Sequence, residues 1–221
     1  MSEVIQIKDL SFSYGADTKP VLLIPHLTIT KNEAIFLFGP SGSGKTTLLE
    51  ILAGVITGQK GEVEILGQKT QLMSLSERDR FRSNHIGYIF QQFNLIPYLT
   101  VKENILLPFT FSEKKLNSAL YEKIVSALGL AEYADQLASK LSVGQQQRVA
   151  AARALVIEPE IILADEPTSA LDSDHREKFL EILFTLVKDQ GSTLIFVSHD
   201  RSIQNLFDRQ LSLSDVNVVR H

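Results

Sequence analysis

Hydrophobic positions along the chain fall into short runs that alternate with longer stretches of helical spacing. The short runs are rich in β-branched and aromatic residues and predict strands. These runs are Val4–Ile7, Leu22–Thr30, Ala34–Phe38, Glu62–Leu66, Ile161–Ala164 and Thr193–Val197. Apolar residues three and four apart predict helices over Thr46–Gly54, Asn117–Leu128, Arg148–Val156 and His175–Asp189. Strands that alternate with helices predict an α/β domain with a mainly parallel sheet.

The middle of the chain departs from this alternation. From Ser74 to about Gly129 the sequence carries charge-rich segments and few strand-like runs. We therefore expect an inserted α-helical subdomain, at approximately residues 92–158, before the strand that begins at Ile161. The 221 residues show no internal repeat and no low-complexity linker, which predicts a single domain over residues 1–221.

Composition narrows the possible environments and partners. The formal net charge of −4 argues against a nucleic-acid-binding protein, since such proteins carry a clustered basic excess. The absence of cysteine excludes disulfides and thiolate metal sites. No run approaches the roughly 18 apolar residues that a membrane span needs, and residues 1–10 lack a signal-peptide core. We expect a protein that is soluble when isolated, with a peripheral role at most at a membrane.

A glycine-rich loop follows the apolar strand Ala34–Phe38 and opens the next helix. It matches the pattern G-x-x-x-x-G-K-S/T without a gap. Its residues are Gly39, Pro40, Ser41, Gly42, Ser43, Gly44, Lys45 and Thr46. Glycines let backbone N–H groups surround phosphates, and the start of the helix adds partial positive charge. Lys45 can reach the β- and γ-phosphates and the Thr46 hydroxyl can ligate Mg²⁺, which predicts a nucleoside triphosphate site.

Two carboxylates, Asp165 and Glu166, end the apolar strand that begins at Ile161. Ligands of parallel α/β sheets bind at the carboxyl ends of the strands. Asp165 would hold Mg²⁺ through water, and Glu166 could orient the attacking water or accept its proton. Alone, an acidic strand end is more often a solvated loop. Together with the glycine-rich loop it predicts a metal–phosphate site.

A third motif begins at Leu141 and continues through Ser142, Val143, Gly144 and Gln145. Ser142 and Gln145 have the spacing of a capping box, which predicts the start of a helix. The glycine in the first turn leaves backbone N–H groups open to an anion. These residues alone do not decide between an anion site and a helix that is simply well capped.

These motifs, with His199 after the strand Thr193–Val197, resemble ATP-binding cassette (ABC) ATPases in order and spacing over essentially the whole chain. The resemblance implies a P-loop NTPase core, an N-terminal antiparallel β part and hydrolysis of ATP with Mg²⁺. It also implies a head-to-tail dimer, in which each ATP lies between the glycine-rich loop of one subunit and Ser142–Gln145 of the other. One chain holds every part of a site, so a homodimer with two equivalent sites is expected.

The resemblance assigns roles to single residues. Tyr14 would stack on adenine, although its surroundings alone favour an ordinary strand residue. Gln91 would contact Mg²⁺ and sense a membrane partner, with Gln92 as its rival. His199 would contact the γ-phosphate, although a lone strand-end histidine is more often structural. The implied catalytic residues are Lys45, Gln91, Glu166 and His199, and the implied metal ligands are Thr46, Gln91 and Asp165.

Three further positions complete the implied nucleotide contacts. Thr47 follows the glycine-rich loop. Asp172 ends Ser169–Asp172, which resembles the loop that couples the two sites across the dimer. Val143 departs from the family pattern, because it stands where the motif most often has its first glycine. We expect this change to be tolerated and to affect the rate of hydrolysis rather than its presence.

The segments around Gln91 indicate one branch of the family. Leu75–Arg82, Ile86–Pro97 and Leu99–Pro108 are similar to the lipoprotein-release and macrolide-efflux branch, which includes LolD-, MacB- and FtsE-like ATPases. That resemblance implies an integral membrane permease of the FtsX, MacB or LolCE type as partner, and a place at the cytoplasmic face of the inner membrane. The segment after Pro108 is shorter than is usual for the branch.

An apolar group near Gln91 is a candidate groove for a short helix of that partner. Its members are Phe93, Leu95, Ile96 and Tyr98. Each of them alone could equally belong to the core of the subdomain.

Other classes of function explain the sequence less well. A soluble cassette protein acting on DNA or ribosomes would join two cassettes or carry a coiled-coil insertion, and this chain has neither. A non-hydrolysing regulatory module would be expected to lose Glu166 or His199, and both are present. A small-molecule kinase would leave Leu141–Gln145 unexplained. We therefore expect an ATPase subunit of a membrane exporter or force-transmitting complex, whose substrate the sequence does not encode.

Overall fold

The computed structural model describes residues 2–15, 18–57 and 60–219. The chain forms two compact units. The first combines Met1–Asp79 with Ile195–His221, and the second is Arg80–Leu194. The boundaries between the units fall inside α2 (Leu75–His85) and inside β8 (Thr193–Val197).

The first unit contains an antiparallel sheet with the strand order β2-β1-β4-β5. Its strands are β1 (Glu3–Phe12), β2 (Leu22–Thr30), β4 (Lys60–Ile65) and β5 (Gln68–Lys69). Ile7 faces Leu27 on one side and Val63 on the other, and all three are buried. Alternating apolar residues therefore form one buried face, which confirms the expected antiparallel β part.

Strand β1 extends beyond the predicted Val4–Ile7. The prediction stopped short because the alternation of buried and exposed residues shifts after Ile7. The pairing of β1 with β4 shifts between Lys8 and Ser11, where Asp9 has a left-handed φ of 51°. The buried positions move from Ile7 to Leu10 across this irregularity. A bulge of this kind interrupts the period of two on which the prediction depended.

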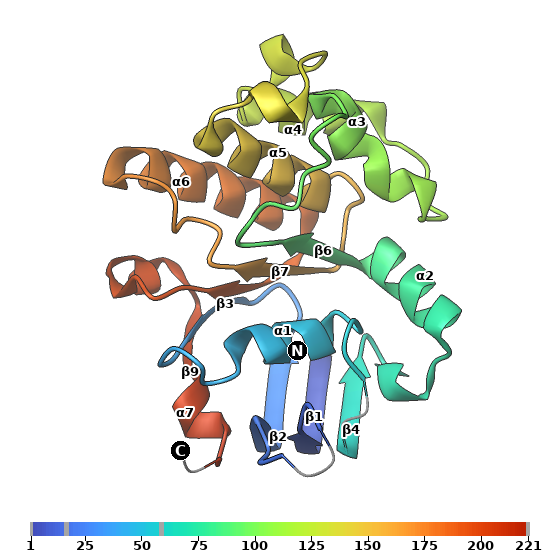
Figure 1. The fold of residues 1–221 in the computed structure, drawn as a ribbon, viewed down its shortest axis with the longest axis vertical. Helices are drawn as coiled ribbons and strands as arrows, with labels where there is room; N and C mark the ends of the chain where they lie inside the picture. The colour runs from blue at the N-terminus through green and yellow to red at the C-terminus, as the bar shows by residue number, and fades with distance from the viewer. Residues whose placement is uncertain (1, 16–17, 58–59, 220–221) are drawn as a thin grey trace. The chain divides into compact units, whose positions relative to one another are not determined.

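The rest of the first unit places the glycine-rich loop. Strand β3 (Ala34–Phe38) pairs in parallel with β9 (Arg209–Ser212) and leads through the loop into α1 (Lys45–Leu52). Helix α1 ends before the predicted Gly54, because Gly54 has a left-handed φ of 67° and donates its N–H to the Ile51 carbonyl. After β9 the chain forms the short helix α7 (Leu213–Val216), which contacts β2 (Figure 1).

The second unit is built on the parallel pair β6 (Ile86–Ile89) and β7 (Ile161–Asp165). Gly87, in the middle of β6, lies against α5 (Val143–Leu155). A Cβ on Gly87 would overlap the Ala154 carbonyl oxygen and lie 3.0 Å from the Pro159 ring. The absence of a side chain therefore allows the helix to approach the strand this closely.

Helices gather on one side of this strand pair, as Figure 1 shows. They are α3 (Val101–Leu106), α4 (Ser118–Ala127), α5 and α6 (Ser173–Gln190), and the first two pack on α5. Helices α3, α4 and α5 fall within residues 92–158, where the helical subdomain is predicted. Turns of 3₁₀ helix occupy Leu107–Thr110, Ala131–Tyr133 and Ala138–Lys140 here, and Thr70–Leu72 and Arg201–Leu206 in the first unit. Within the described residues, no helix is long and apolar enough to cross a membrane.

Candidate nucleotide-binding site

At two positions of the glycine-rich loop, the backbone has a conformation that only glycine adopts without strain. Gly42 has φ 76°, and Gly44, the N-cap of α1, has φ 98°. A Cβ on Gly44 would lie 2.8 Å from Leu22 Cδ2 and 3.2 Å from Val21 Cγ1. Left-handed backbone and close packing against the start of β2 therefore both require glycine at position 44.

Lys45 brings a buried positive charge to this loop. It is 7% exposed, and its Nζ donates hydrogen bonds of 2.9 Å to the carbonyl oxygens of Gly39 and Pro40. The ammonium group thus lies across the loop at the N-terminus of an eight-residue helix. Positive charge, a helix N-terminus and glycine backbone together suit a polyphosphate. Thr46, next along the chain, is exposed.

Tyr14 lies beyond the end of β1 and is 64% exposed, so it is not the half-buried strand residue of the alternative interpretation. Its hydroxyl lies 2.9 Å from Thr47 Oγ1, and its ring meets Phe12 edge-on, with the ring centroids 5.1 Å apart. The hydrogen bond ties an exposed aromatic ring to the first turn of α1. Such a ring is suitable for stacking on a base.

His199 follows β8 in the first unit, and it is exposed. The preceding residue, Ser198, donates its N–H to the Leu37 carbonyl of β3 at 3.3 Å. The following residue, Asp200, caps the turn Arg201–Leu206 by accepting from the Ser202 N–H at 2.9 Å. His199 therefore emerges next to the strand whose end carries the glycine-rich loop.

Asp165 ends β7 in the second unit and Glu166 follows it directly; the two residues are 6% and 8% exposed. Glu166 has a left-handed φ of 48°, and its carbonyl accepts the Ser169 N–H at 3.2 Å. Left-handed backbone costs a non-glycine residue about 1 kcal/mol or more, and such strain collects at functional sites. The buried carboxylates are inconsistent with the alternative of a solvated acidic loop.

Gln91 and Gln92 are both exposed and follow β6. The next two residues, Phe93 and Asn94, have left-handed φ values of 59° and 49°. Arg153 of α5 holds this turn: its guanidinium donates to the Phe93 carbonyl at 2.6 Å and to the Asn94 carbonyl at 2.7 Å. Burial lowers the pKa of Arg153 to about 10.

Arg153 was not among the predicted site residues. Arg153 is one of two arginines in α5, and no local sequence pattern connects it with a turn about sixty residues away.

The capping box at Ser142 is confirmed. The Gln145 N–H donates to Ser142 Oγ at 3.4 Å, and the Ser142 N–H donates to Gln145 Oε1 at 2.8 Å. Val143, at the first position of α5, is 51% exposed. Its side chain faces solvent in the isolated chain and leaves the helix start regular. A Cβ on Gly144 would meet Leu171 at 3.6 Å, an ordinary contact distance.

Asp172 caps α6. Its Oδ1 accepts from the His175 N–H at 3.0 Å, and both carboxylate oxygens lie 2.8 Å from His175 Nδ1. Hydrogen bonds from the backbone N–H and then the ring of His175 lower the pKa of Asp172. The side chain is exposed and ionised at neutral pH. The predicted residues thus divide between the units: the loop, Tyr14, Thr47 and His199 lie in the first, and the others in the second.

Comparisons with known proteins identify the family. The sequence profile described as "ABC transporter" matches residues 24–169. An uncharacterised ABC transporter ATP-binding protein, YbbA of Escherichia coli K12, is 39% identical over 95% of this chain and 94% of its own length. The lipoprotein-releasing system ATP-binding protein LolD of Bacteroides fragilis is 35% identical over 98% of this chain and all of its own length.

A solved structure agrees with these relatives. It is the dimeric ATP-binding cassette MJ0796 in a post-hydrolysis state with ADP and Pi, which superimposes with a TM-score of 0.86 at 36% identity over 98% of this chain and 97% of that one. A curated protein of the same name, from Methanocaldococcus jannaschii, is 39% identical over 98% of this chain and 96% of its own length. The expected α/β P-loop fold and ATPase class are confirmed. The chain belongs to the ABC transporter family as an ATP-binding, ATP-hydrolysing cassette.

Proposed function

We propose that two copies of this chain hydrolyse ATP at two equivalent composite sites and thereby drive a membrane permease. The observation that carries the proposal is Glu166, a buried carboxylate held in left-handed backbone directly after Asp165. In a chain of the ABC family that also carries a phosphate-binding loop, such a group suits a residue that orients water for attack.

The first unit would bind the nucleotide. Tyr14 would stack on adenine, and Gly39–Thr47 would surround the phosphates with backbone N–H groups, hydroxyls and the Lys45 ammonium. Lys45 would exchange its bonds to two carbonyls for bonds to phosphate oxygens. His199 would donate to the γ-phosphate and stabilise the charge that it develops.

Magnesium would be held by Thr46, Gln91 and Asp165, with water and phosphate oxygens completing the coordination. The set fits the ion: a hydroxyl, an amide and a carboxylate supply the hard oxygen ligands that Mg²⁺ prefers, with few protein carboxylates. When bound, Mg²⁺ neutralises charge on the β- and γ-phosphates. Glu166 would orient the attacking water, and Lys45 and His199 would stabilise the departing charge.

The dimer would complete each site. Ser142, Val143, Gly144 and Gln145 of one subunit would close over the ATP bound by the other, using the open N–H groups at the start of α5. Asp172, at the start of α6, would couple the two sites. The dimeric state of MJ0796 with ADP and Pi supports this arrangement, because that relative is similar to this chain over nearly its full length.

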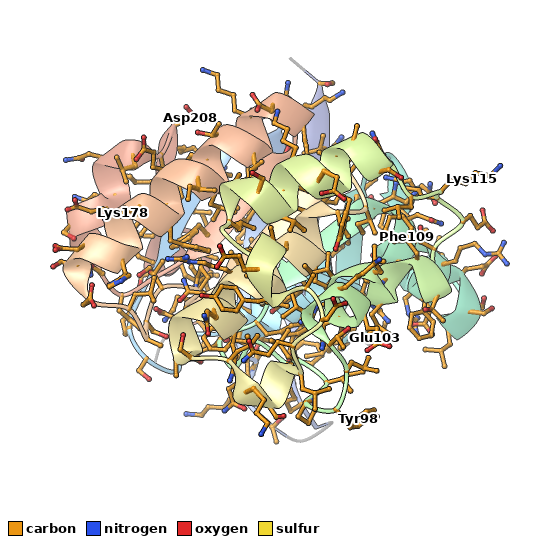
Figure 2. All side chains as sticks on the ribbon, turned by 90° about the horizontal axis from the view of Figure 1, so that it is seen from above. Tyr98, Glu103, Phe109, Lys115, Lys178 and Asp208 are labelled. Carbon is orange, nitrogen blue, oxygen red and sulfur yellow. The ribbon has the colours of Figure 1, made fainter. Side chains whose placement is uncertain are left out.

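The membrane partner would be a permease of the LolCE, MacB or FtsX type, with the ATPase on the cytoplasmic face of the inner membrane. LolD of B. fragilis is named for lipoprotein release, and MacB of Shigella flexneri, 35% identical over the whole of this chain, for macrolide export. The docking surface would centre on Tyr98, which is 75% exposed and lies at the outer margin of the ribbon in Figure 2. Phe93 is 8% exposed and belongs to the core rather than to this surface.

The test is Mg²⁺-dependent ATP hydrolysis by the purified chain, compared with Glu166→Gln, while molecular mass is recorded with and without ATP. We expect turnover by the wild type and an ATP-stabilised dimer in the variant. A variant that hydrolyses ATP as fast as the wild type would remove Glu166 from the mechanism. A wild type that stays monomeric at every ATP concentration, yet turns over, would remove the shared site.

A further inference from the structure

The segment after β9 reaches back to the glycine-rich loop through one side chain, that of Asn217. This residue follows α7 and is 7% exposed. Its Nδ2 donates to the carbonyl oxygens of Val21 at 3.0 Å and of Ser43 at 3.3 Å, and its Oδ1 accepts from the Leu23 N–H at 2.8 Å. One buried carboxamide therefore connects the C-terminal segment, the start of β2 and the loop, all within the first unit.

Neighbouring backbone bonds hold Asn217 in place. Its N–H donates to the Leu213 carbonyl at 2.8 Å, and the Val218 N–H donates to the Leu23 carbonyl at 2.9 Å. The Val219 N–H lies 3.4 Å from Asn217 Oδ1. The segment is thus bonded before, at and after Asn217, so the carboxamide has a fixed direction relative to β2.

The bond to Ser43 determines the direction of the next N–H group in the loop. A trans peptide unit is planar, and its C=O and N–H point to opposite sides. Because the Ser43 carbonyl points to Asn217, the Gly44 N–H must point away from the C-terminal segment. Backbone N–H groups of such a loop are the groups that bind phosphate. Gly44 has left-handed backbone, so this peptide unit is also one that glycine would otherwise allow to rotate.

Packing alone does not restrain the loop on this side. A cavity of about 260 Å³ adjoins it, and its lining includes Pro40, Ser41, Gly42 and Ser43 of the loop and Ser214 and Asn217 of the C-terminal segment. Pro40, Ser41 and Gly42 are exposed on this side, so close packing does not fix that part of the loop. The hydrogen bond from Asn217 holds the carbonyl of the next residue, Ser43, which is buried.

We propose that Asn217 is a positioning residue, which fixes the Ser43–Gly44 peptide of the glycine-rich loop in the orientation that binds phosphate. The inference rests on the proposed role of Gly39–Thr46 in binding ATP. Asn217 does not touch the nucleotide, and its effect passes through the Ser43 carbonyl. It joins to the site a part of the chain in which the sequence alone indicates no function.

Asn217→Asp tests this inference in the full chain. An aspartate is isosteric, keeps the acceptor for the Leu23 N–H and loses the donor to the Ser43 and Val21 carbonyls. Ser214→Ala is the matched control, since Ser214 is exposed and lines the same cavity. We expect the Kd and KM for MgATP to rise about five- to tenfold in Asn217→Asp, as the loss of one hydrogen bond predicts. We expect kcat to change by less than about twofold, and Ser214→Ala to match the wild type.

A second variant separates positioning from folding. Asn217→Ala removes the carboxamide without adding charge, so a rise in KM shared by both variants supports the inference even if Asn217→Asp is poorly folded. Unchanged Kd and KM in a variant with a lowered melting temperature would overturn it, and would leave Asn217 a purely structural residue. Lys45→Ala, measured in parallel, distinguishes a failure of this inference from a failure of the proposed role of the loop. If Lys45→Ala binds ATP like the wild type, the proposed role of the loop fails, and the inference fails with it.

Discussion

Arg153 should tolerate replacement by methionine better than replacement by lysine. Its two hydrogen bonds, to the Phe93 and Asn94 carbonyls at 2.6 and 2.7 Å, are charge-assisted. Bonds of this kind contribute about 1.5–3 kcal/mol each, or about 3–6 kcal/mol together. Burial of the charge opposes them, because it lowers the pKa of Arg153 well below its usual value, to about 10. That reduction corresponds to about 3 kcal/mol.

The two substitutions shift this balance differently. Arg153→Met removes both bonds and also the cost of the buried charge, so we expect the free energy of unfolding to fall by about 1–2 kcal/mol. Arg153→Lys keeps a buried charge, but one ammonium group replaces a planar fork and reaches one carbonyl rather than two. The lysine variant therefore keeps the free-energy cost of a buried charge and loses half of the stabilisation from the two hydrogen bonds. We therefore expect a loss of about 1.5–3 kcal/mol, larger than that of the methionine variant.

Urea unfolding followed by circular dichroism measures both values, since the chain has no tryptophan to report by fluorescence. Arg148→Met is the matched control, because it removes a guanidinium from the same helix. Amide exchange at Phe93 and Asn94 gives a local reading, and it should accelerate in both Arg153 variants but not in the control. A lysine variant as stable as the methionine variant, or more so, would refute the balance of bonds against burial.

Three further outcomes are expected. Tyr98→Glu should abolish co-purification with the membrane partner and spare ATP binding. Leu72→Glu is the control, because Leu72 is also apolar and is 77% exposed. Retained co-purification of Tyr98→Glu would contradict the proposed docking surface. Gly44→Ala should weaken ATP binding more than Gly42→Ala in calorimetric titration, because both positions are left-handed but only a Cβ at 44 has a neighbour within 4 Å; equal losses would mean that strain alone decides. The lowered pKa of Asp172 means that its carboxylate stabilises the start of α6 above the ordinary pKa of 3.8, and that this stabilisation is lost as the pH falls through the lowered value. Asp172→Ala should remove this acid-dependent loss of amide protection at the start of α6. An unchanged pH profile would exclude the cap as its source.

Three strands could be predicted to the residue. Leu22–Thr30, Ala34–Phe38 and Thr193–Val197 match β2, β3 and β8, because turn residues or charged helices bound each run on both sides. The elements that were missed lack such a pattern. Helix α2 buries only Phe81 among its eleven residues, and β6 has four residues with a glycine at the second. Their stability comes from tertiary neighbours, which local periodicity does not encode.

The motifs of the site could be predicted because their chemistry is local in sequence. A glycine-rich loop, an acidic strand end and a capping box each need particular residue types at short spacing. Arg153 and Asn217 act instead through carbonyls 60 and 174 residues away. An arginine or asparagine that recognises backbone carbonyls leaves no partner of recognisable type in the sequence. Only the structure could reveal these two contacts.

Gly87 limits how this chain can change over evolutionary time. Every single-nucleotide replacement of a glycine codon that gives another amino acid adds a side chain, and the Ala154 carbonyl leaves no room for a Cβ at this position. A lineage that accepts a side chain at position 87 would have to move α5 first. That helix carries Ser142 at one end and Arg153 near the other, so the proposed nucleotide contact and the turn after Gln91 would shift in the same event. Drift at this interior strand position is therefore coupled to the ATPase itself, although Gly87 has no part in its chemistry.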